Sequence, residues 1–319
     1  MPAITAAQIT ALNTATFTFA ADVDAWTRTR LKNHYIPWFN QKLANRGAWT
    51  GVTLVDTPAN QVGFHVFWNN IGALTGGTAT PFQFLALMGI FANECRADFK
   101  PVAEKMGRAG FPGLTYLYDA IPGLKRSYNT LKGNKTAFQS FRNAAFNTAH
   151  GAKEPAARLR NTTDARWSGP DYPRADFPTA PDPAVAGYIM EADFMKFRGR
   201  GFIQTTGRGN YSKIIEYVQA YTGDNNVIDF YQAQWTGMSV DDIAYSTSNG
   251  DWDRLFQETD LIIAAEAIRL HNVSSGDYLA LTGDPDRAIL NMGKRISGGD
   301  VYAAKYRDRM ESVIVQALT

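Results

Sequence analysis

Disulfide bonds are excluded from this chain, because its 319 residues contain a single cysteine, Cys95. A disulfide framework of the kind that stabilises small secreted domains is therefore absent. The first residues also lack the basic segment and the apolar segment of a secretory signal peptide. From these two absences we expect a protein that is made in the cytoplasm without a signal peptide.

Long apolar runs and long basic runs are missing as well. The most apolar stretch, residues 84–92, is about half as long as a membrane-spanning helix, so no membrane span is expected. The net charge is only +2 and no Lys/Arg cluster stands out, which argues against nucleic acid as a partner. His34, His65, His150 and His271 are far apart and show no ligand spacing, so we expect no metal and no cofactor.

The patterns that are present favour helices. Hydrophobic residues make up 45% of the chain and charged residues 19%, as in ordinary globular proteins. Residues 45–80 are rich in Gly, Thr and Asn and are predicted as loops with short strands, and residues 151–183 as a surface insertion. Apolar spacing and capping residues predict helices from Ala6 after Thr5, and over 21–44, 81–95, 210–221, 252–271 and 299–318.

The predicted helix over 81–95 ends in a carboxylate. Its apolar residues form one face, and Glu94 falls beside that face at the end of the helix. A second acid, Glu104, follows ten residues later. Two such carboxyl groups can serve glycoside hydrolysis, in which one protonates the leaving oxygen and the other activates water. Most acid pairs at this spacing are solvated surface charges, so the pair alone is a weak signal.

A glycine-rich segment from Phe197 to Tyr211 is the second candidate. Its glycines do not fit a dinucleotide-binding or phosphate-binding motif. Gln204, Thr206 and Asn210 offer neutral hydrogen-bonding groups suited to sugar hydroxyls and acetamides. The alternative is a purely structural role, as a glycine-rich turn before a helix.

This segment closely resembles the signature of family 19 glycoside hydrolases, which include chitinases and phage endolysins. Weaker similarities follow in the expected order at residues 4–12, 81–104 and 296–299 with Arg307. The residues that match the signature are Gly199, Arg200, Gly201, Ile203, Gln204, Asn210 and Tyr211.

The resemblance implies a mainly α, lysozyme-like fold with at most a small β-element. It implies one domain over residues 1–319, with long insertions near 45–78 and 120–195. Glu94 would be the general acid and Glu104 the general base of an inverting mechanism, with Asp98 as an alternative base. Thr206 would help to hold the attacking water. The residues expected to bind the sugar chain are Arg200, Gln204, Asn210, Tyr211 and Ser297.

Several positions depart from the family pattern. Asn93 replaces the usual His before the catalytic Glu, Cys95 and Arg96 replace small residues, and Ser297 replaces an Asn. Phe99 lies one place later than in the family, so Glu104 is assigned with a shift of one residue.

Peptidoglycan is the expected substrate, since the opening resembles the endolysin branch and no signal peptide or disulfide framework is present. Chitinase is the alternative enzyme, and an inactive virion or wall-binding protein with the same fold is the alternative from another class. We expect a monomer that acts on the cell wall after release or within a virion. The aromatic residues Trp26, Trp38, Trp68 and Tyr35 are predicted as core, with a sugar-stacking face as the alternative.

Overall fold

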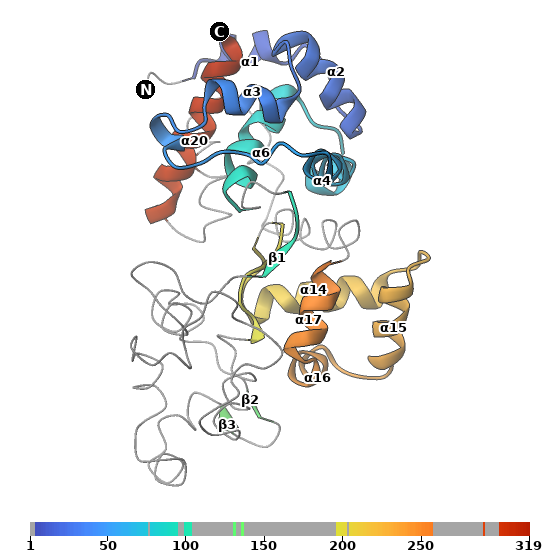
Figure 1. Cartoon of the computed structure of the whole chain (residues 1–319). Helices are drawn as coiled ribbons and strands as arrows, with labels where there is room; N and C mark the ends of the chain where they lie inside the picture. The colour runs from blue at the N-terminus through green and yellow to red at the C-terminus, as the bar shows by residue number, and fades with distance from the viewer. Residues whose placement is uncertain are drawn as a thin grey trace, which may run out of the picture. The chain divides into compact units, whose positions relative to one another are not determined.

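The computed structural model describes residues 4–75, 77–94, 99–103, 130–131, 135–136, 196–202, 204–257, 290 and 300–319 (Figure 1). These residues are mainly helical, as predicted. The strands in this part of the chain form two two-stranded sheets. One pairs β1 with β4, and the other pairs β2 with β3. The elements are α1 (Ala6–Leu12), α2 (Ala20–Arg30), α3 (Tyr35–Lys42), η1 (Gly47–Trp49), α4 (Pro58–Trp68), α5 (Ile71–Thr75), α6 (Pro81–Glu94), β1 (Val102–Ala103), β2 (Thr130–Leu131), β3 (Lys135–Thr136), β4 (Arg200–Gly201), α14 (Arg208–Ala220), α15 (Asn226–Gln234), α16 (Val240–Ser246), α17 (Asn249–Gln257) and α20 (Asp300–Leu318).

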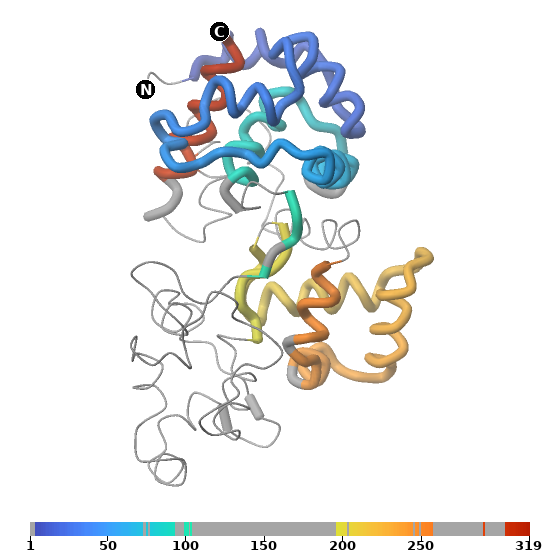
Figure 2. The backbone as a smooth tube through the Cα atoms, viewed as in Figure 1, coloured from blue at the N-terminus to red at the C-terminus, as the bar shows by residue number. Residues whose placement is uncertain are grey.

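The chain divides into two compact units rather than one. Unit 1 comprises residues 1–102, 201–203 and 259–319, and unit 2 comprises residues 103–200 and 204–258. Unit 1 is therefore built from both ends of the sequence, and the colours of Figure 2 trace its N-terminal segment in blue and its C-terminal segment in red. The single lysozyme-like domain predicted over residues 1–319 stays a prediction.

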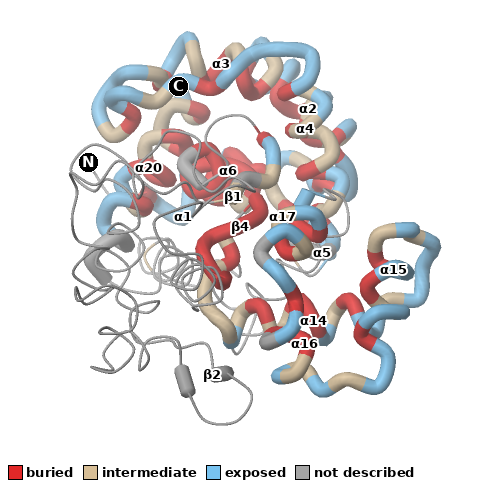
Figure 3. The backbone as a smooth tube through the Cα atoms, turned by 60° about the horizontal axis from the view of Figure 1, so that its bottom comes forward, coloured by how far each residue is buried: buried red, intermediate tan, exposed pale blue. Residues whose placement is uncertain are grey.

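Helix α6 forms the centre of unit 1. All of its residues from Phe84 to Ala92 are buried, and Figure 3 shows this helix in the colour of buried residues. Helix α20 packs along it. Gly89 permits this approach, because a Cβ added there would lie 2.6 Å from the Cα of Met310. Since the helix axes can approach closely only where side chains are small, Gly89 helps to set the spacing of α6 and α20.

An aromatic cluster surrounds the same helix. Trp68, at the end of α4, is completely buried. Its ring centroid lies 4.8 Å from that of Phe84 and 5.3 Å from that of Phe67, both in edge-to-face geometry. The rings of Phe64 and Phe91 lie 6.4 and 6.2 Å from it. Rings of this size bury a large apolar area, so this cluster contributes much of the hydrophobic free energy of unit 1.

The described residues of unit 2 form a core around α14 and α17. Tyr211 and Trp252 are completely buried, with ring centroids 4.9 Å apart. Helix α14 also packs against α15 and α16. Two of these helices begin with side-chain caps, since Asn225 accepts from the backbone of α15 and Ser239 from that of α16.

Most predicted helices are confirmed. Thr5 caps α1 in a capping box with Gln8, and α6, α14 and α20 begin within two residues of the predicted positions. Helix α17 covers the described part of the helix predicted over 252–271, and residues 258–271 lie outside the described residues. The insertions predicted near 120–195 and 151–183 also lie almost entirely outside them.

Two predictions in the N-terminal part were wrong. The helix predicted over 21–44 is two helices, because in a continuous helix the ring of Pro37 would collide with the carbonyl of Asn33. In α3 the same proline lies in the first turn, where backbone N–H groups have no partner within the helix, so the missing N–H of proline costs no hydrogen bond. Residues 45–80, predicted as loops and strands, hold η1, α4 and α5. Thr57 caps α4 and Pro58 opens it, a helix-start signal that the Gly/Thr/Asn composition obscured.

Candidate functional site

The signature segment forms a tight hairpin that leads into α14. Arg200 and Thr205 exchange two backbone hydrogen bonds, with N···O distances of 3.1 and 2.8 Å. Gly207 then caps α14 with a φ of +86°, a backbone conformation that favours glycine. The glycines of this segment therefore shape the turn, as the glycine-rich pattern indicated.

Gln204 lies in this hairpin with a left-handed backbone. Its φ of +52° is uncommon for a residue with a side chain and costs about 1–2 kcal/mol. Such strain persists only where the surrounding structure fixes the conformation, and it is concentrated at functional sites. Gln204 is half-buried, so part of its surface remains accessible to solvent.

A chain of hydrogen bonds joins Gln204 to the start of α14. The Thr206 hydroxyl donates to the Gln204 carbonyl at 2.9 Å, and the Asn210 side-chain amide donates to the Thr206 carbonyl at 2.8 Å. All three residues are half-buried. The structure thus brings together three of the predicted site residues, Gln204, Thr206 and Asn210, as neighbouring neutral polar groups on one surface segment of unit 2.

Charged side chains lie buried beside this hairpin. Asp253 of α17 accepts from Arg198 Nη2 at 3.0 and 3.1 Å and from Arg200 Nε at 2.6 Å. Both arginines are completely buried, whereas the Asp253 side chain is 32% exposed. Buried charges require such partners, because removal from water is unfavourable for an isolated ion. This network fixes the strand that enters the hairpin.

Tyr211 completes the network. Its hydroxyl accepts from Arg200 Nη1 at 2.8 Å and donates to the Arg198 carbonyl at 2.6 Å. Burial raises the pKa of the Tyr211 hydroxyl, so it remains a neutral donor near pH 7. Arg200 Nη1 also donates to the Lys196 carbonyl at 2.6 Å. Two backbone carbonyls before the hairpin, those of Lys196 and Arg198, are therefore held by the side chains of Arg200 and Tyr211.

Arg200 and Tyr211 do not occupy the sugar-contacting positions expected of them. Both have no exposed surface, and their polar atoms bond within the protein. As buried residues, Arg200 and Tyr211 support the turn that contains Gln204 and do not contact a ligand themselves. Asp253, which was not predicted, belongs with them, and no sequence spacing relates it to Arg200, because 53 positions separate the two.

The carboxylates fall largely outside the described residues. Glu94 is the last residue of α6, so its backbone position at the end of a buried helix is described, but its side chain is not. Glu104, Asp98 and Ser297 lie outside the described residues, as does Cys95.

Two histidines that are far apart in the sequence lie beside the same carboxylate, that of Asp24. His65 Nε2 of α4 lies 2.7 Å from one carboxylate oxygen of Asp24, and His34 Nδ1 lies 3.5 Å from the other. Asp24 is in α2 and His34 precedes α3, so this contact links three helices. In the described part of the chain, no group of three or more His, Cys, Asp or Glu side chains is arranged to hold a metal ion.

The tryptophans predicted as core are confirmed as core. Trp26, Trp38, Trp68 and Tyr35 are all at least 94% buried. A sugar-stacking face made of these four rings is therefore not present in unit 1.

Comparisons of the chain with protein family models, curated proteins and solved structures found no match. Among the described residues, no helix is both long enough and apolar enough to cross a bilayer.

Proposed function

We propose that this protein is a peptidoglycan hydrolase with a lysozyme-like fold, which cleaves β-1,4 glycosidic bonds of the cell wall. The hairpin that presents Gln204, Thr206 and Asn210 carries this proposal. It is the segment that resembles the signature of family 19 glycoside hydrolases, and Gln204 within it has a left-handed backbone, a conformation that is enriched at functional sites.

The chemistry of the three side chains suits an amino-sugar polymer. Carboxamides and hydroxyls both donate and accept hydrogen bonds, as hydroxyl and acetamide groups of the polymer require. The Thr206 hydroxyl and the Gln204 backbone are held by their hydrogen bond before any ligand arrives. Preorganised groups of this kind lose little conformational entropy on binding.

Glu94 is assigned as the general acid. It ends α6, which is packed on all sides in unit 1, so its backbone has a rigid support. In the proposed reaction Glu94 donates its proton to the leaving glycosidic oxygen. Glu104, or Asp98 in the alternative, removes a proton from a water molecule that attacks the anomeric carbon from the opposite face. The anomeric configuration is thereby inverted, and Thr206 would help to orient the water.

The proposal needs no metal and no cofactor, since two carboxyl groups and one water supply the whole reaction. It places the protein on the cell wall after release from the cytoplasm or within a virion, and it describes a monomer.

The direct test is digestion of purified peptidoglycan, with the products identified by mass spectrometry. Glu94→Gln should reduce the rate by about 10²–10⁴-fold, because it removes general acid catalysis. Glu216→Gln, at an exposed position on α14, is the matched control and should retain full activity. Proton NMR of the first product should show the inverted anomer.

Other outcomes discriminate between the alternatives. Release of sugars from chitin oligomers without digestion of peptidoglycan would establish a chitinase. Sedimentation with the wall, without any product and without an effect of Glu94→Gln, would establish a wall-binding protein. Glu104→Gln and Asp98→Asn, assayed in parallel, identify the base as the one whose replacement abolishes turnover.

The role of Thr206 can be tested separately. Thr206→Val removes the hydroxyl, whereas Thr206→Ser retains it. If the hydroxyl orients water, the valine variant should lose at least tenfold in kcat with little change in KM, and the serine variant should recover most of the rate.

A further inference from the structure

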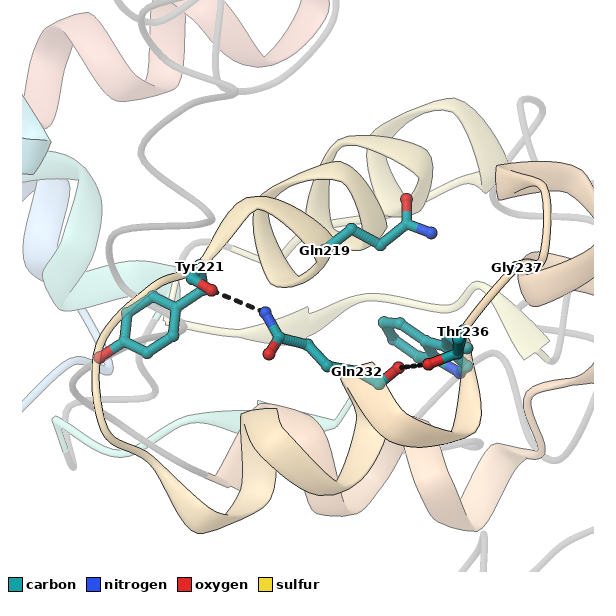
Figure 4. A pocket seen from close by; sticks show the side chains of 6 residues that line it. Gln219, Tyr221, Gln232, Thr236 and Gly237 are labelled. Atoms are coloured by element: carbon teal, nitrogen blue, oxygen red, sulfur yellow. Dashed lines mark hydrogen bonds between the residues drawn. The ribbon is translucent and has the colours of Figure 1, made fainter.

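A pocket lies in unit 2 apart from the signature hairpin, between the carboxyl ends of α14 and α15 (Figure 4). Its volume is about 440 Å³, within the range of small-molecule sites. Figure 4 shows Gln219 on one side and Thr236 with Gly237 on the other, and Gln232 reaching toward Tyr221. The lining residues are Gln219, Tyr221, Gln232, Trp235, Thr236 and Gly237, all of them uncharged at neutral pH.

Gln232 is fixed in one orientation. Its amide nitrogen donates to the carbonyls of Val218 and Tyr221, both at 2.7 Å, and so caps the end of α14. Both amide protons are thereby used, which leaves the side-chain oxygen as an acceptor. The Thr236 hydroxyl donates to the backbone carbonyl of Gln232, four residues earlier, at 3.0 Å, and its lone pairs remain as acceptors. The fixed polar groups of the pocket therefore present acceptors.

The sequence segment that forms the pocket is acidic. Residues 216–242, which contain the whole pocket, include five acidic residues and no Lys, Arg or His. The carboxyl ends of α14 and α15 both lie at the pocket, and each adds partial negative charge. An anionic ligand is therefore disfavoured. A ligand rich in hydrogen-bond donors and without negative charge is favoured.

The remaining lining side chains are two aromatic rings and one glutamine that can change its rotamer. Trp235 is 97% buried yet contributes to the wall, and Tyr221 is half-buried. Gln219 is exposed, and its amide nitrogen lies at a long 3.5 Å from the Met238 carbonyl, so it can turn to a ligand at little cost. Saccharides combine apolar ring faces with hydroxyl donors, and the half-buried ring of Tyr221, rather than the buried Trp235, is the aromatic surface that can meet a ring face.

We propose that this pocket binds an uncharged N-acetylated hexosamine unit of a glycan chain, as a second sugar site apart from the catalytic residues. The uncharged, donor-rich character of the ligand follows from the pocket. The choice of an amino sugar rests on the proposed function. A site of this kind would hold the polymer to unit 2 while hydrolysis proceeds elsewhere.

The test uses the full chain with Glu94→Gln, so that the oligosaccharide is not consumed. The protein is labelled with 5-fluorotryptophan, and its seven tryptophans are observed by fluorine NMR during titration with the N-acetylglucosamine tetramer. Trp235→Phe assigns the pocket resonance. We expect the Trp235 signal to shift with saturation in the millimolar range or below.

Variants at exposed lining positions locate the binding. Gln219→Ala should weaken the tetramer about fivefold through loss of one hydrogen bond. Thr236→Tyr, which fills the pocket, should abolish the shift. Gln234→Ala, an exposed glutamine of α15 that does not line the pocket, is the matched control and should bind normally.

A hyaluronan tetrasaccharide, which carries carboxylates, should bind at least tenfold more weakly. The proposal is overturned if Trp235 does not respond to the neutral tetramer, if Thr236→Tyr leaves the shift intact, or if the anionic tetrasaccharide binds equally well. Failure of the proposed function would give a different experimental result. A wild-type protein that digests no glycan, while Trp235 still responds, removes the hydrolase proposal and leaves the sugar site standing.

Discussion

The two segments that carry the proposed chemistry are supported by opposite kinds of packing. Helix α6, which ends at Glu94, is surrounded in unit 1 by aromatic and aliphatic side chains. The hairpin with Gln204 in unit 2 is held by Arg198, Arg200 and Asp253 through charged hydrogen bonds. One segment is fixed by burial of apolar surface, and the other by polar contacts of defined geometry.

This difference matches what each segment must present. Hydrophobic burial is non-directional and needs only a filled volume, which suffices to place a helix and its last residue. Hydrogen bonds have preferred distances and angles, so they can hold individual carbonyls and a strained residue such as Gln204. Four predictions would break or sharpen the comparison.

The largest effect is expected in the aromatic cluster of unit 1. Trp68→Ala should lower the free energy of unfolding by about 3–5 kcal/mol, because it leaves a cavity among the rings of Phe64, Phe67 and Phe84. Urea denaturation followed by circular dichroism measures the change. Val62→Ala, on the same helix but 61% exposed, is the control and should alter stability by less than about 0.5 kcal/mol. Equal effects of the two variants would contradict the apolar account of unit 1.

The charged network of unit 2 should follow. Asp253→Asn removes the carboxylate that faces two buried guanidinium groups, and we expect a loss of roughly 3 kcal/mol, the lower end for a broken buried pair because Asp253 is partly exposed. Hydrogen exchange should show faster exchange in α14 and α17, with α6 unchanged. Asp229→Asn, at an exposed site on α15, should change neither. Uniform loss of protection in both units would refute independent support of the two segments.

Close helix packing in unit 1 should give an intermediate effect. Gly89→Ala forces α6 and α20 apart at Met310 and should destabilise by about 1–3 kcal/mol. Gly72→Ala in α5 is matched to it, since its added Cβ would lie 3.7 Å from the nearest described atom, and it should be neutral or stabilising by up to about 1 kcal/mol. Thermal unfolding of both variants checks the pair, and a stabilised Gly89→Ala variant would show that α20 adjusts freely.

The smallest effect is electrostatic and belongs to the start of α2. Backbone hydrogen bonds from Thr18 and Phe19 lower the pKa of Asp22 below its ordinary value. A lowered folded-state pKa stabilises the protein above the unfolded-state pKa, and that contribution is lost as the pH falls through the folded value. We expect about 0.5–1 kcal/mol, as for other helix caps.

The Asp22 prediction is measured as the difference in unfolding free energy between the natural chain and Asp22→Asn, from pH 7 to pH 2. The difference should shrink below about pH 4. The same subtraction for the exposed Asp224→Asn should remain flat, and a flat curve for Asp22→Asn would remove the capping role.

Local signals in the sequence predicted much of the helical structure. Thr5 with Gln8, Pro81, and the apolar spacing of residues 299–318 each indicate a helix through nearest neighbours along the chain. The break before α3 was missed, although Pro37 is a signal for it, since proline cannot lie inside a continuous helix. Helix α4 was not predicted, because its composition resembles that of a loop. Burial of its apolar face stabilises the helix only when the face packs against α2 and the aromatic cluster.

The candidate site divides in the same way. Glycines and neutral polar residues predicted a turn that presents Gln204, Thr206 and Asn210, and the structure groups these three. The sequence gives no indication that Arg200 and Tyr211 face inward, because polar side chains are ordinarily exposed and become buried only when a partner is present. Asp253 is that partner, and it comes from another helix.

The sequence by itself determined the helical character of the chain, several helix boundaries and the residue types of the signature hairpin, because each depends on interactions within a few positions. Only the tertiary structure decided the division into two units, the burial of Arg200 and Tyr211, the meeting of His34 and His65 at Asp24, and the uncharged pocket between α14 and α15. Each of these depends on side chains that are distant in sequence, and their proximity follows from packing rather than from spacing along the chain.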